Sequence, residues 1–306
     1  MGASNAATTI FTCPKPFIGR TAFHQRNALQ SWLRLEPRPE IILLGDEIGV
    51  AETAAELGLV HIPAVACNDH GTPLVNDIFQ QAERAARGDT LAWVNTDIIL
   101  FQDFATAIGR ARAAKPRFLM IGQRWDLDVA APIDFADTHW EQQLRARVTS
   151  DAVLHWIFGV DYYVYTRGLF APMPPFAVGR TAYDRWMIWR ARARRVPVID
   201  ATSVVSCIHQ NHERTYAALG KQAVSGENDL RHGSEAEHNQ VLAREESGQL
   251  YDLRYATHRL TRRALLPFTA YNALRRFVYR VVLRNARAML RGSVRAGRPT
   301  SLAGNS

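Results

Sequence analysis

The chain has 306 residues, of which 47% are hydrophobic and 22% charged. This length and composition suit one large domain or two modest ones with a sizeable core, and they exclude a mainly disordered chain. No apolar run reaches the roughly 18 residues that predict a membrane span. The formal net charge of +8 is unevenly distributed: residues 253–306 hold 12 arginines and no acid, so residues 1–252 set 25 basic side chains against all 29 acidic ones. A nucleic-acid enzyme more often spreads its basic residues over the catalytic body, so nucleic acid is not an expected partner.

The cysteines and the N-terminus bear on the compartment. Residues 1–9 are small and polar, without the basic start and apolar run of a secretory signal. Cys13, Cys67 and Cys207 lie far apart and form no CxxC pair, so neither a disulfide framework nor a zinc knuckle is predicted. We expect a reduced, cytoplasmic protein.

The first 120 residues alternate between strand and helix patterns. Continuous apolar or β-branched runs predict strands, and periods of three to four predict helices between them. The predicted strands are 8–12, 40–45, 59–65 and 90–94, and the predicted helices are 25–35, 50–57 and 74–87, the last capped by Thr72. This alternation indicates a Rossmann-type, mostly parallel α/β sheet, whose ligands bind at the carboxyl ends of the strands. Four loops therefore become candidates, at 13–15, 46–49, 68–71 and 95–97; no GxGxxG and no P-loop motif occurs.

The second half has a less regular pattern. We expect a strand at 118–122, a helix at 182–194 capped by Thr181, and a strand within 196–207 that ends near 208–212. Residues 213–250 are polar and predict a mobile loop. A basic amphipathic helix is predicted at 268–291, with arginines three and four residues apart on one face.

Asn95, Thr96 and Asp97 follow a buried strand. A carboxylate at the binding edge of a sheet can hold a divalent cation, which takes its remaining ligands from substrate phosphates. The alternative is a solvated turn, because Asn and Asp favour turns. His209 and His212 follow a later apolar strand and could offer one metal ligand and one phosphate or acceptor contact, although a lone histidine is more often structural. Three histidines in zinc-ligand spacing are absent, so a catalytic zinc is not predicted.

Asp184 lies where the helix at 182–194 begins. It could act as a general base on a sugar hydroxyl, with Arg180 holding an anionic group, or it could simply stabilise the first turn of the helix.

Two further strand ends carry candidate nucleotide contacts. Thr12, Pro14 and Lys15 end the first strand, where a nucleotide would lie. Asp46 and Glu47 end the second strand, where an acid can hold a ribose or base edge; a polar turn is the alternative.

Segments in a fixed order over about residues 8–260 resemble the GT-A-fold nucleotide-sugar glycosyltransferases, in particular a family-two-like group of bacteria and plants known mostly by fold. The segments are TIFTCPKPF, QRNALQSW, IILLGDEIGV, GTPLVNDIF, WVNTDIIL, GQRWD, GVDYYVYTRGLF, PPFAVGRTAYDRW and IDATSVVSCIHQNH. The resemblance implies a GT-A-like catalytic domain at 1–252, with a nucleotide-binding half to about 120 and an acceptor half from about 121, followed by a basic helical tail at 253–306.

The resemblance also implies roles for individual residues. Asn95-Thr96-Asp97 stands at the DxD motif, so Asp97 and His209 would bind Mn²⁺ or Mg²⁺, and Asn95 departs from the usual first acid. Asp184 would be the base of an inverting transfer. The remaining implied contacts fall into two groups: Thr12, Pro14, Lys15, Asp46, Asn95 and Thr96 for the nucleotide, and Trp125, Asp126, Asp161, Arg180 and His212 for the donor or acceptor sugar.

The basic tail suggests a place of action. A basic amphipathic helix that is too polar to span a bilayer can lie on an anionic membrane, and lipid-linked glycans would be met there. We therefore expect a cytoplasmic enzyme, peripheral on the inner face of the membrane, that uses a nucleotide-sugar donor and a glycan or lipid-linked acceptor. The alternative for the helix is packing on the catalytic domain or on a second subunit. Alternative functions are a nucleotidyltransferase acting on sugar phosphates and a non-catalytic membrane-surface scaffold of the same fold.

Overall fold

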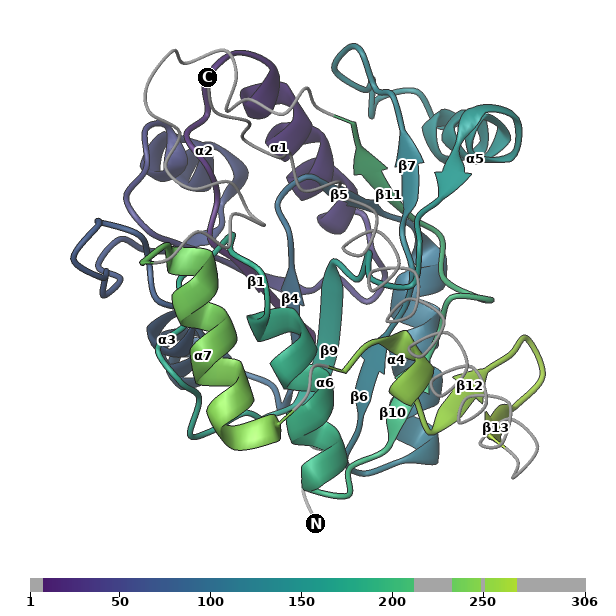
Figure 1. Ribbon diagram of the computed structural model, residues 1–306. Coiled ribbons are helices and arrows are strands. Elements are labelled where there is room, and N and C mark those ends of the chain that lie inside the picture. Colours follow the sequence, from purple (N-terminus) through teal and green to yellow (C-terminus); the bar gives the residue numbers. More distant parts are fainter. Residues whose placement is uncertain (1–7, 212–232, 249–250, 269–306) are drawn as a thin grey trace, which may run out of the picture. The chain divides into compact units, whose positions relative to one another are not determined.

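The computed structural model describes residues 8–211, 233–248 and 251–268 (Figure 1). Contacts divide the chain into two units, Met1–Leu266 and Pro267–Ser306, and only Pro267 and Phe268 of the second unit are described. His212 and, apart from Phe268, the predicted helix at 268–291 lie outside the described residues. None of the helices in the described part of the chain has the length and hydropathy that a membrane crossing requires.

The elements alternate as the sequence predicts over the first 100 residues. The strands are β1 (Thr8–Thr12), β2 (Glu40–Leu44), β3 (Val60–Ile62), β4 (Thr90–Val94), β5 (Ile98–Leu100), β6 (Leu119–Ile121), β7 (Trp125–Leu127), β8 (Val153–Leu154), β9 (Tyr162–Thr166), β10 (Val198–Asp200), β11 (Cys207–Gln210), β12 (His258–Leu260) and β13 (Leu265–Pro267). The helices are α1 (Gly19–Trp32), α2 (Val50–Leu57), α3 (Val75–Ala85), α4 (Gln102–Ala114), α5 (Trp140–Asp151), α6 (Tyr183–Ala193) and α7 (Glu235–Ser247), with a short 3₁₀ turn, η1 (Leu253–Tyr255).

A large, mostly parallel sheet forms the centre and confirms the predicted fold class. Its strand order is β13-β12-β10-β6-β9-β4-β1-β2-β3. Strands β4, β1, β2 and β3 are mutually parallel, as are β6, β10 and β12. Strand β9 lies between these groups and is antiparallel to both β4 and β6. The carboxyl ends of β1, β2 and β4 therefore share one edge, with β9 entering from that edge.

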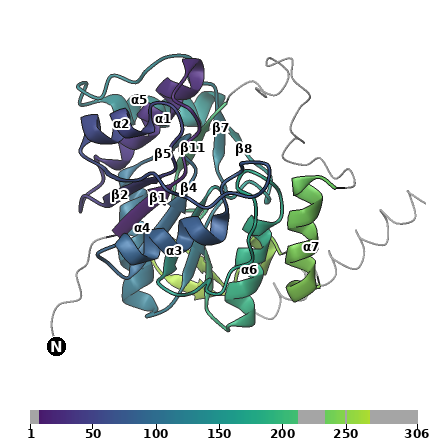
Figure 2. The same cartoon turned by 90° about the vertical axis from the view of Figure 1, so that its left-hand side faces the viewer.

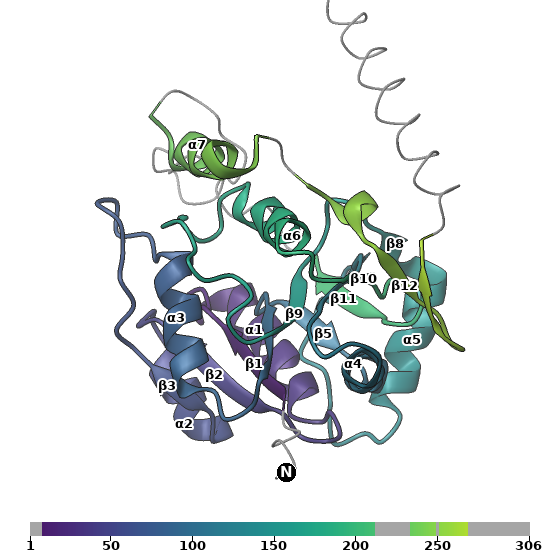
Figure 3. The same ribbon diagram turned by 90° about the horizontal axis from the view of Figure 1, so that it is seen from below.

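Alternate side chains along the strands belong to two different hydrophobic cores, one on each face of this sheet. Ile10 of β1 and Val164 of β9 belong to a mostly aliphatic cluster with helices α1, α2 and α4. Their neighbours Phe11 and Tyr165 face the other side, where Phe79 of α3 stacks on Tyr165 at 5.7 Å between ring centroids. Figure 3 shows α3 and α6 on this aromatic side, with α7 beyond α6. Both faces are covered, which explains the continuous apolar runs in these strands.

A second, four-stranded sheet lies beside the first and was not predicted as a separate sheet. Its order is β5-β11-β7-β8, and Figure 2 shows these strands following one another. Helix α5 packs on it, with Leu144 buried against Phe101 and Ile208. This sheet brings together segments that are about 100 residues apart in sequence, so it determines where several of the candidate residues meet.

Several predicted element ends differ from the structure. Helix α2 ends at Leu57, as predicted, and Gly58 follows it in a left-handed conformation. Neither Thr72 nor Thr181 caps a helix: Leu74 and Ala182 occupy the N-cap positions of α3 and α6, and neither helix has a side-chain cap. Thr72 instead belongs to a turn in which its backbone N–H donates to the side chain of Asn68.

The predicted mobile stretch at 213–250 contains helix α7, so that prediction is wrong for residues 235–247. Helices α4 and α5 were not predicted. The stretch after residue 252, assigned from sequence to the tail, supplies β12, which pairs in parallel with β10.

Candidate active site

The carboxyl ends of β1 and β4 place the first candidate residues together. Thr12 and Thr96 are both buried, and their hydroxyl oxygens lie 2.7 Å apart in a hydrogen bond. Strands β1 and β4 are parallel neighbours, so residues that follow both strands meet at the same edge. The two threonines therefore link the carboxyl ends of β1 and β4 at this edge.

The loops after β1 and β2 form the adjoining rim. The backbone N–H of Phe17 donates to the carbonyl of Ile48 at 2.8 Å, which joins the two loops. Within this rim Pro14 is buried, whereas Lys15 and Asp46 are exposed and available to a ligand. Gln25 fixes the backbone of Lys15 through two hydrogen bonds of 2.8 Å. The structure thus gathers all the predicted nucleotide contacts along one edge.

The second sheet brings Asp97 to His209. Ile98 of β5 pairs with His209 of β11, and Gln210 donates its backbone and side-chain N–H groups to the carbonyl of Asp97, at 3.3 and 3.0 Å. His209 Nε2 then lies 3.7 Å from Asp97 Oδ2. The two predicted metal ligands, which are more than 100 residues apart in sequence, are neighbours in the structure.

On its other side, His209 faces Asp126. The parallel pairing of β11 with β7 sets His209 beside Asp126, and His209 Nδ1 lies 3.3 Å from Asp126 Oδ1. Asp126 also binds His155, whose Nδ1 lies 2.5 Å from Asp126 Oδ2, and Arg124, whose Nε lies 2.9 Å from Asp126 Oδ1. Asp126 is therefore the central carboxylate of a cluster of two histidines and one arginine.

Arg124 extends this cluster to Asp161 and Asn95. Its guanidinium lies 2.6 Å from Asp161 Oδ2, while Asn95 Nδ2 donates to Asp161 Oδ1 at 2.7 Å. The backbone N–H of Asn95 also donates to the carbonyl of Asp161, continuing the β4–β9 pairing by one residue. Asn95, the position that departs from the DxD pattern, is thus a hydrogen-bond donor to a buried carboxylate. An aspartate there would place two negative charges in contact.

The charged groups of the cluster shift one another's pKa values. Burial alone would raise the pKa of Asp126, but the interactions with His209, His155 and Arg124 outweigh it and hold this pKa well below its usual range. Burial likewise lowers the pKa of His209, but the facing Asp126 and Asp97 reverse the effect, so the net shift is upward. For Arg124, burial lowers the pKa, but Asp161 and Asp126 outweigh this effect and raise it, so the guanidinium stays charged. Asp126 and Arg124 therefore stay charged near neutral pH.

Asp184 lies in the first turn of α6 and is partly buried. Burial raises the pKa of the Tyr163 hydroxyl most, and the negative charges of Asp184 and Asp161 raise it further. Asp184 and Asp161 are therefore both near enough to Tyr163 to influence its hydroxyl.

Two other predicted sugar contacts have structural partners. Arg180 is buried and ion-paired with Glu235 of α7, with Nη2 2.8 Å from Oε2. Glu235 also accepts a hydrogen bond of 2.7 Å from Asn68. Arg180 therefore anchors α7 to the loop before α6. Trp125 lies in β7 between Leu154 and Ile208, and its side chain is partly exposed.

Sequence reasoning missed Arg124 and His155. Arg124 lies in the quoted GQRWD segment, where its position beside Asp126 was the available signal. His155 follows the two-residue strand β8, and no local pattern marks it.

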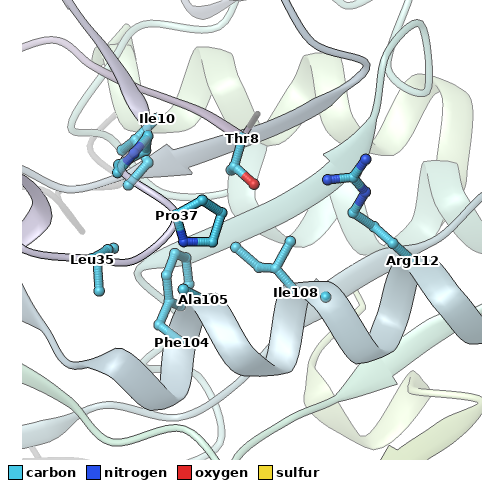
Figure 4. Close-up of a pocket in the computed structure, with 10 residues that line it drawn as sticks. Thr8, Ile10, Leu35, Pro37, Phe104, Ala105, Ile108 and Arg112 are labelled. Atoms are coloured by element: carbon cyan, nitrogen blue, oxygen red, sulfur yellow. The ribbon is translucent and has the colours of Figure 1, made fainter. Parts of the chain in front are cut away.

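A small cavity of about 60 Å³ lies away from this cluster (Figure 4). Thr8, Pro37, Phe104 and Arg112 line it, near the amino end of β1. Its walls are mostly apolar side chains of β1, of the turn at 35–39 and of α4. It is a packing gap at the opposite end of the strand, and we assign it no part in the site.

The pair Asp97 and His209 suits a divalent cation that takes further ligands from a substrate. Two ligand atoms that each lie about 2.1 Å from one ion are roughly 3–4 Å apart at ordinary coordination angles. The observed separation of 3.7 Å agrees with that spacing. Among the described residues, no three His, Cys, Asp or Glu side chains are grouped to hold a metal ion, so a bound diphosphate would have to complete the shell.

We expect Asp126→Asn to weaken Mn²⁺ binding by about 10- to 100-fold, because an acid that orients a histidine ligand has an effect of this size. The amide keeps the shape of the side chain but loses the charge that holds both histidines. Asp128→Asn is the matched control, since this acid lies two residues further on and forms an exposed ion pair with Arg20. Titration calorimetry with Mn²⁺ and saturating nucleotide measures the difference. Equal affinity in the two variants would contradict the assignment.

Comparison with known proteins yields structural likenesses alone: no family model and no curated protein matches the chain. Among solved structures, S. aureus TarS 1-349 in complex with UDP-GlcNAc has a TM-score of 0.44 at 10% identity, covering 78% of this chain and 71% of that one. The Pyrobaculum calidifontis mannosyltransferase PcManGT with GDP-Man and Mn²⁺ has a TM-score of 0.42 at 15% identity, covering 71% and 60%.

M. tuberculosis glucosyl-3-phosphoglycerate synthase has a TM-score of 0.45 at 12% identity, covering 79% of this chain and 81% of that one. Another structure of S. aureus TarS 1-349 is matched over only 58% of its length. At this low identity, what this chain does has to come from its own residues.

Proposed function

We propose that the protein is a GT-A-like glycosyltransferase that moves a sugar from a nucleotide-sugar donor to a glycan or lipid-linked acceptor. The observation that carries the proposal is the cluster at the carboxyl edge of the sheet, where His209 lies 3.7 Å from Asp97 and 3.3 Å from Asp126. Thr12, Lys15, Asp46 and Thr96 border the same edge and suit a nucleotide, because parallel α/β sheets bind ligands there.

The chemistry of transfer requires charge at the leaving group and a base at the acceptor. When bound by Asp97 and His209, Mn²⁺ or Mg²⁺ supplies positive charge to the departing diphosphate. Lys15 adds a cation from the β1 loop. Asp184 accepts the proton of the attacking acceptor hydroxyl, and a single displacement inverts the configuration at the transferred carbon. Trp125, Asp126 and Asp161 border the sugars in this arrangement.

Calorimetry with UDP-, GDP-, dTDP- and CMP-sugars, with and without Mn²⁺, tests the proposal. We expect one nucleotide class to bind tightly and to need the metal. Binding without the metal keeps the transferase and removes Asp97 and His209 as metal ligands. A failure of the whole panel favours the non-catalytic scaffold, and turnover of a nucleoside triphosphate with a sugar phosphate favours the nucleotidyltransferase.

We also propose that the basic segment at 268–291 binds an anionic membrane. The sequence supports this with arginines at 276, 280, 284 and 287 and no acid after residue 252. Replacing these four arginines with glutamine in the full chain should weaken binding to phosphatidylglycerol vesicles by about 1 kcal/mol for each charge. Vesicle co-sedimentation measures this, with neutral vesicles as the control. Unchanged retention would refute a membrane role for the segment.

A further inference from the structure

A short loop beside the catalytic cluster exposes aromatic side chains. Between β8 and β9, Trp156 is 58% exposed and Phe158 is 43% exposed. Scattered apolar residues on a surface need no explanation, but two exposed aromatic residues two positions apart beside a polar cluster are a candidate interaction site. The question is which ligand this surface would take.

The backbone of the loop is held at both ends, so the positions from which its aromatic side chains project are defined. The backbone N–H of His155 donates to the carbonyl of Arg124 at 2.9 Å, and Gln123 donates to the carbonyl of His155 at 2.6 Å. At the far end, the N–H of Gly159 donates to the carbonyl of Trp156 at 2.8 Å. A fixed aromatic surface binds a ligand without a large loss of conformational entropy.

His155 offers a polar group on the same loop. Its Nδ1 is engaged by Asp126 at 2.5 Å, and no other described residue hydrogen bonds to the ring. Gly159 packs against the imidazole so closely that an added Cβ would lie 2.2 Å from Cδ2. The ring is therefore fixed on two sides, while 35% of the side chain stays exposed. The remaining nitrogen, Nε2, can exchange a hydrogen bond with a ligand.

The loop also reaches the helix that carries the proposed base. The guanidinium of Arg185, the residue after Asp184, lies 5.2 Å from the centre of the Phe158 ring. At its other end the loop contacts Asp126 through His155. The loop therefore runs between Asp126 and the start of α6, so an acceptor bound to it would lie beside the helix that carries the proposed base.

We propose that this loop is a pyranose-binding subsite for the acceptor, in which the ring of Trp156 stacks on a sugar and His155 Nε2 hydrogen bonds to one of its hydroxyls. The inference rests on the proposed transfer reaction and narrows its acceptor to a carbohydrate. A sugar ring has an apolar C–H face and hydroxyls at its edge, which matches an aromatic ring beside an oriented imidazole.

Most charges near the loop are already paired, which favours an uncharged ligand. Asp126 is paired with Arg124 and Arg254 with Asp252, while the guanidinium groups of Arg185 and Arg254 both lie over Phe158. A lipid chain would use the apolar side chains but leave His155 without a role. A neutral sugar uses both features, so we assign the subsite to a sugar.

Saturation-transfer NMR on the full-length protein tests the inference. The probes are methyl α- and β-pyranosides of glucose, galactose, mannose and N-acetylglucosamine, each with and without the nucleotide that calorimetry identifies. We expect at least one glycoside to bind, and Trp156→Ala and His155→Gln each to weaken it by tenfold or more. Trp156→Phe should restore part of the affinity, because a smaller aromatic ring still stacks.

Two measurements separate this subsite from a general structural effect. Nucleotide affinity should stay within about twofold in Trp156→Ala, and Val241→Ala, which trims an exposed side chain on α7, should leave glycoside binding unchanged. If wild-type protein binds nucleotide but no glycoside, or if Trp156→Ala binds glycosides normally, the subsite is refuted and the transferase stands. If glycosides bind through Trp156 but no nucleotide sugar binds, the proposed function fails and the subsite stands. If Trp156→Ala loses binding to phosphatidylcholine vesicles and keeps glycoside binding, a lipid replaces the sugar.

Discussion

Asp97→Asn should lower sugar transfer by about 100- to 1,000-fold, the usual cost of removing one group that stabilises charge in a transition state. The substitution keeps the size of the side chain. It also keeps the backbone carbonyl that accepts two hydrogen bonds from Gln210, so the link between β5 and β11 survives. What it removes is the negative charge 3.7 Å from His209 Nε2. Mn²⁺ affinity in the presence of nucleotide should fall together with the transfer rate.

Asp89→Asn is the matched control for this experiment. Asp89 precedes β4 and Asp97 follows it, so the two acids lie at opposite ends of one strand. Asp89 forms an exposed ion pair with Arg167, and its loss should change neither the rate nor metal affinity. The measurements are initial rates with the identified donor and calorimetry with Mn²⁺. Normal turnover and normal metal affinity in Asp97→Asn would exclude Asp97 as a ligand.

The central strands could be predicted because each is a continuous apolar run between clear turn residues. β1, β2 and β4 are buried on both faces, and helix α2 ends at a glycine, so local rules suffice there. Strand-end residues such as Thr12, Asn95 and Asp97 follow directly from that alternation and from the geometry of parallel sheets. The position of these residues at one edge of the sheet could therefore be predicted from the sequence.

The second sheet could not be predicted in the same way. Its strands have two to four residues, too few for a hydrophobic period to stand out. His155 and Asp126 meet because β7 pairs with β8, and His209 joins them because β7 also pairs with β11. The partners of Asp126 are set by tertiary pairing, which no local pattern encodes.

Asn95 and Arg180 illustrate the same limit at single residues. From sequence, Asn95 is a departure from a metal-binding pattern; in the structure it donates to Asp161, which also carries the Arg124 ion pair. Arg180 looks available to an anionic ligand until Glu235, 55 residues later, is found beside it. Both residues need a partner that is known only once the chain is folded.

Asp184→Asn should lower transfer by about 100- to 10,000-fold while donor binding stays within about twofold, because a general base contributes to the chemical step and not to nucleotide affinity. Asparagine cannot accept the acceptor proton at neutral pH, but it retains the size of the side chain in the first turn of α6. Single-turnover rates with the bound donor, measured beside calorimetric affinity, separate the two effects.

The competing explanation is that Asp184 only stabilises the start of its helix. A first-turn acid interacts favourably with the helix dipole by about 0.3–1 kcal/mol, which is too little to change a rate 100-fold. Glu52→Gln measures this contribution, since Glu52 is an exposed acid in the first turn of α2. If Asp184→Asn and Glu52→Gln both lower the melting temperature slightly and leave transfer intact, Asp184 is a structural residue. A loss of transfer confined to Asp184→Asn, with donor affinity preserved, identifies Asp184 as the base. No other carboxylate on α6 could then receive the proton of the acceptor hydroxyl.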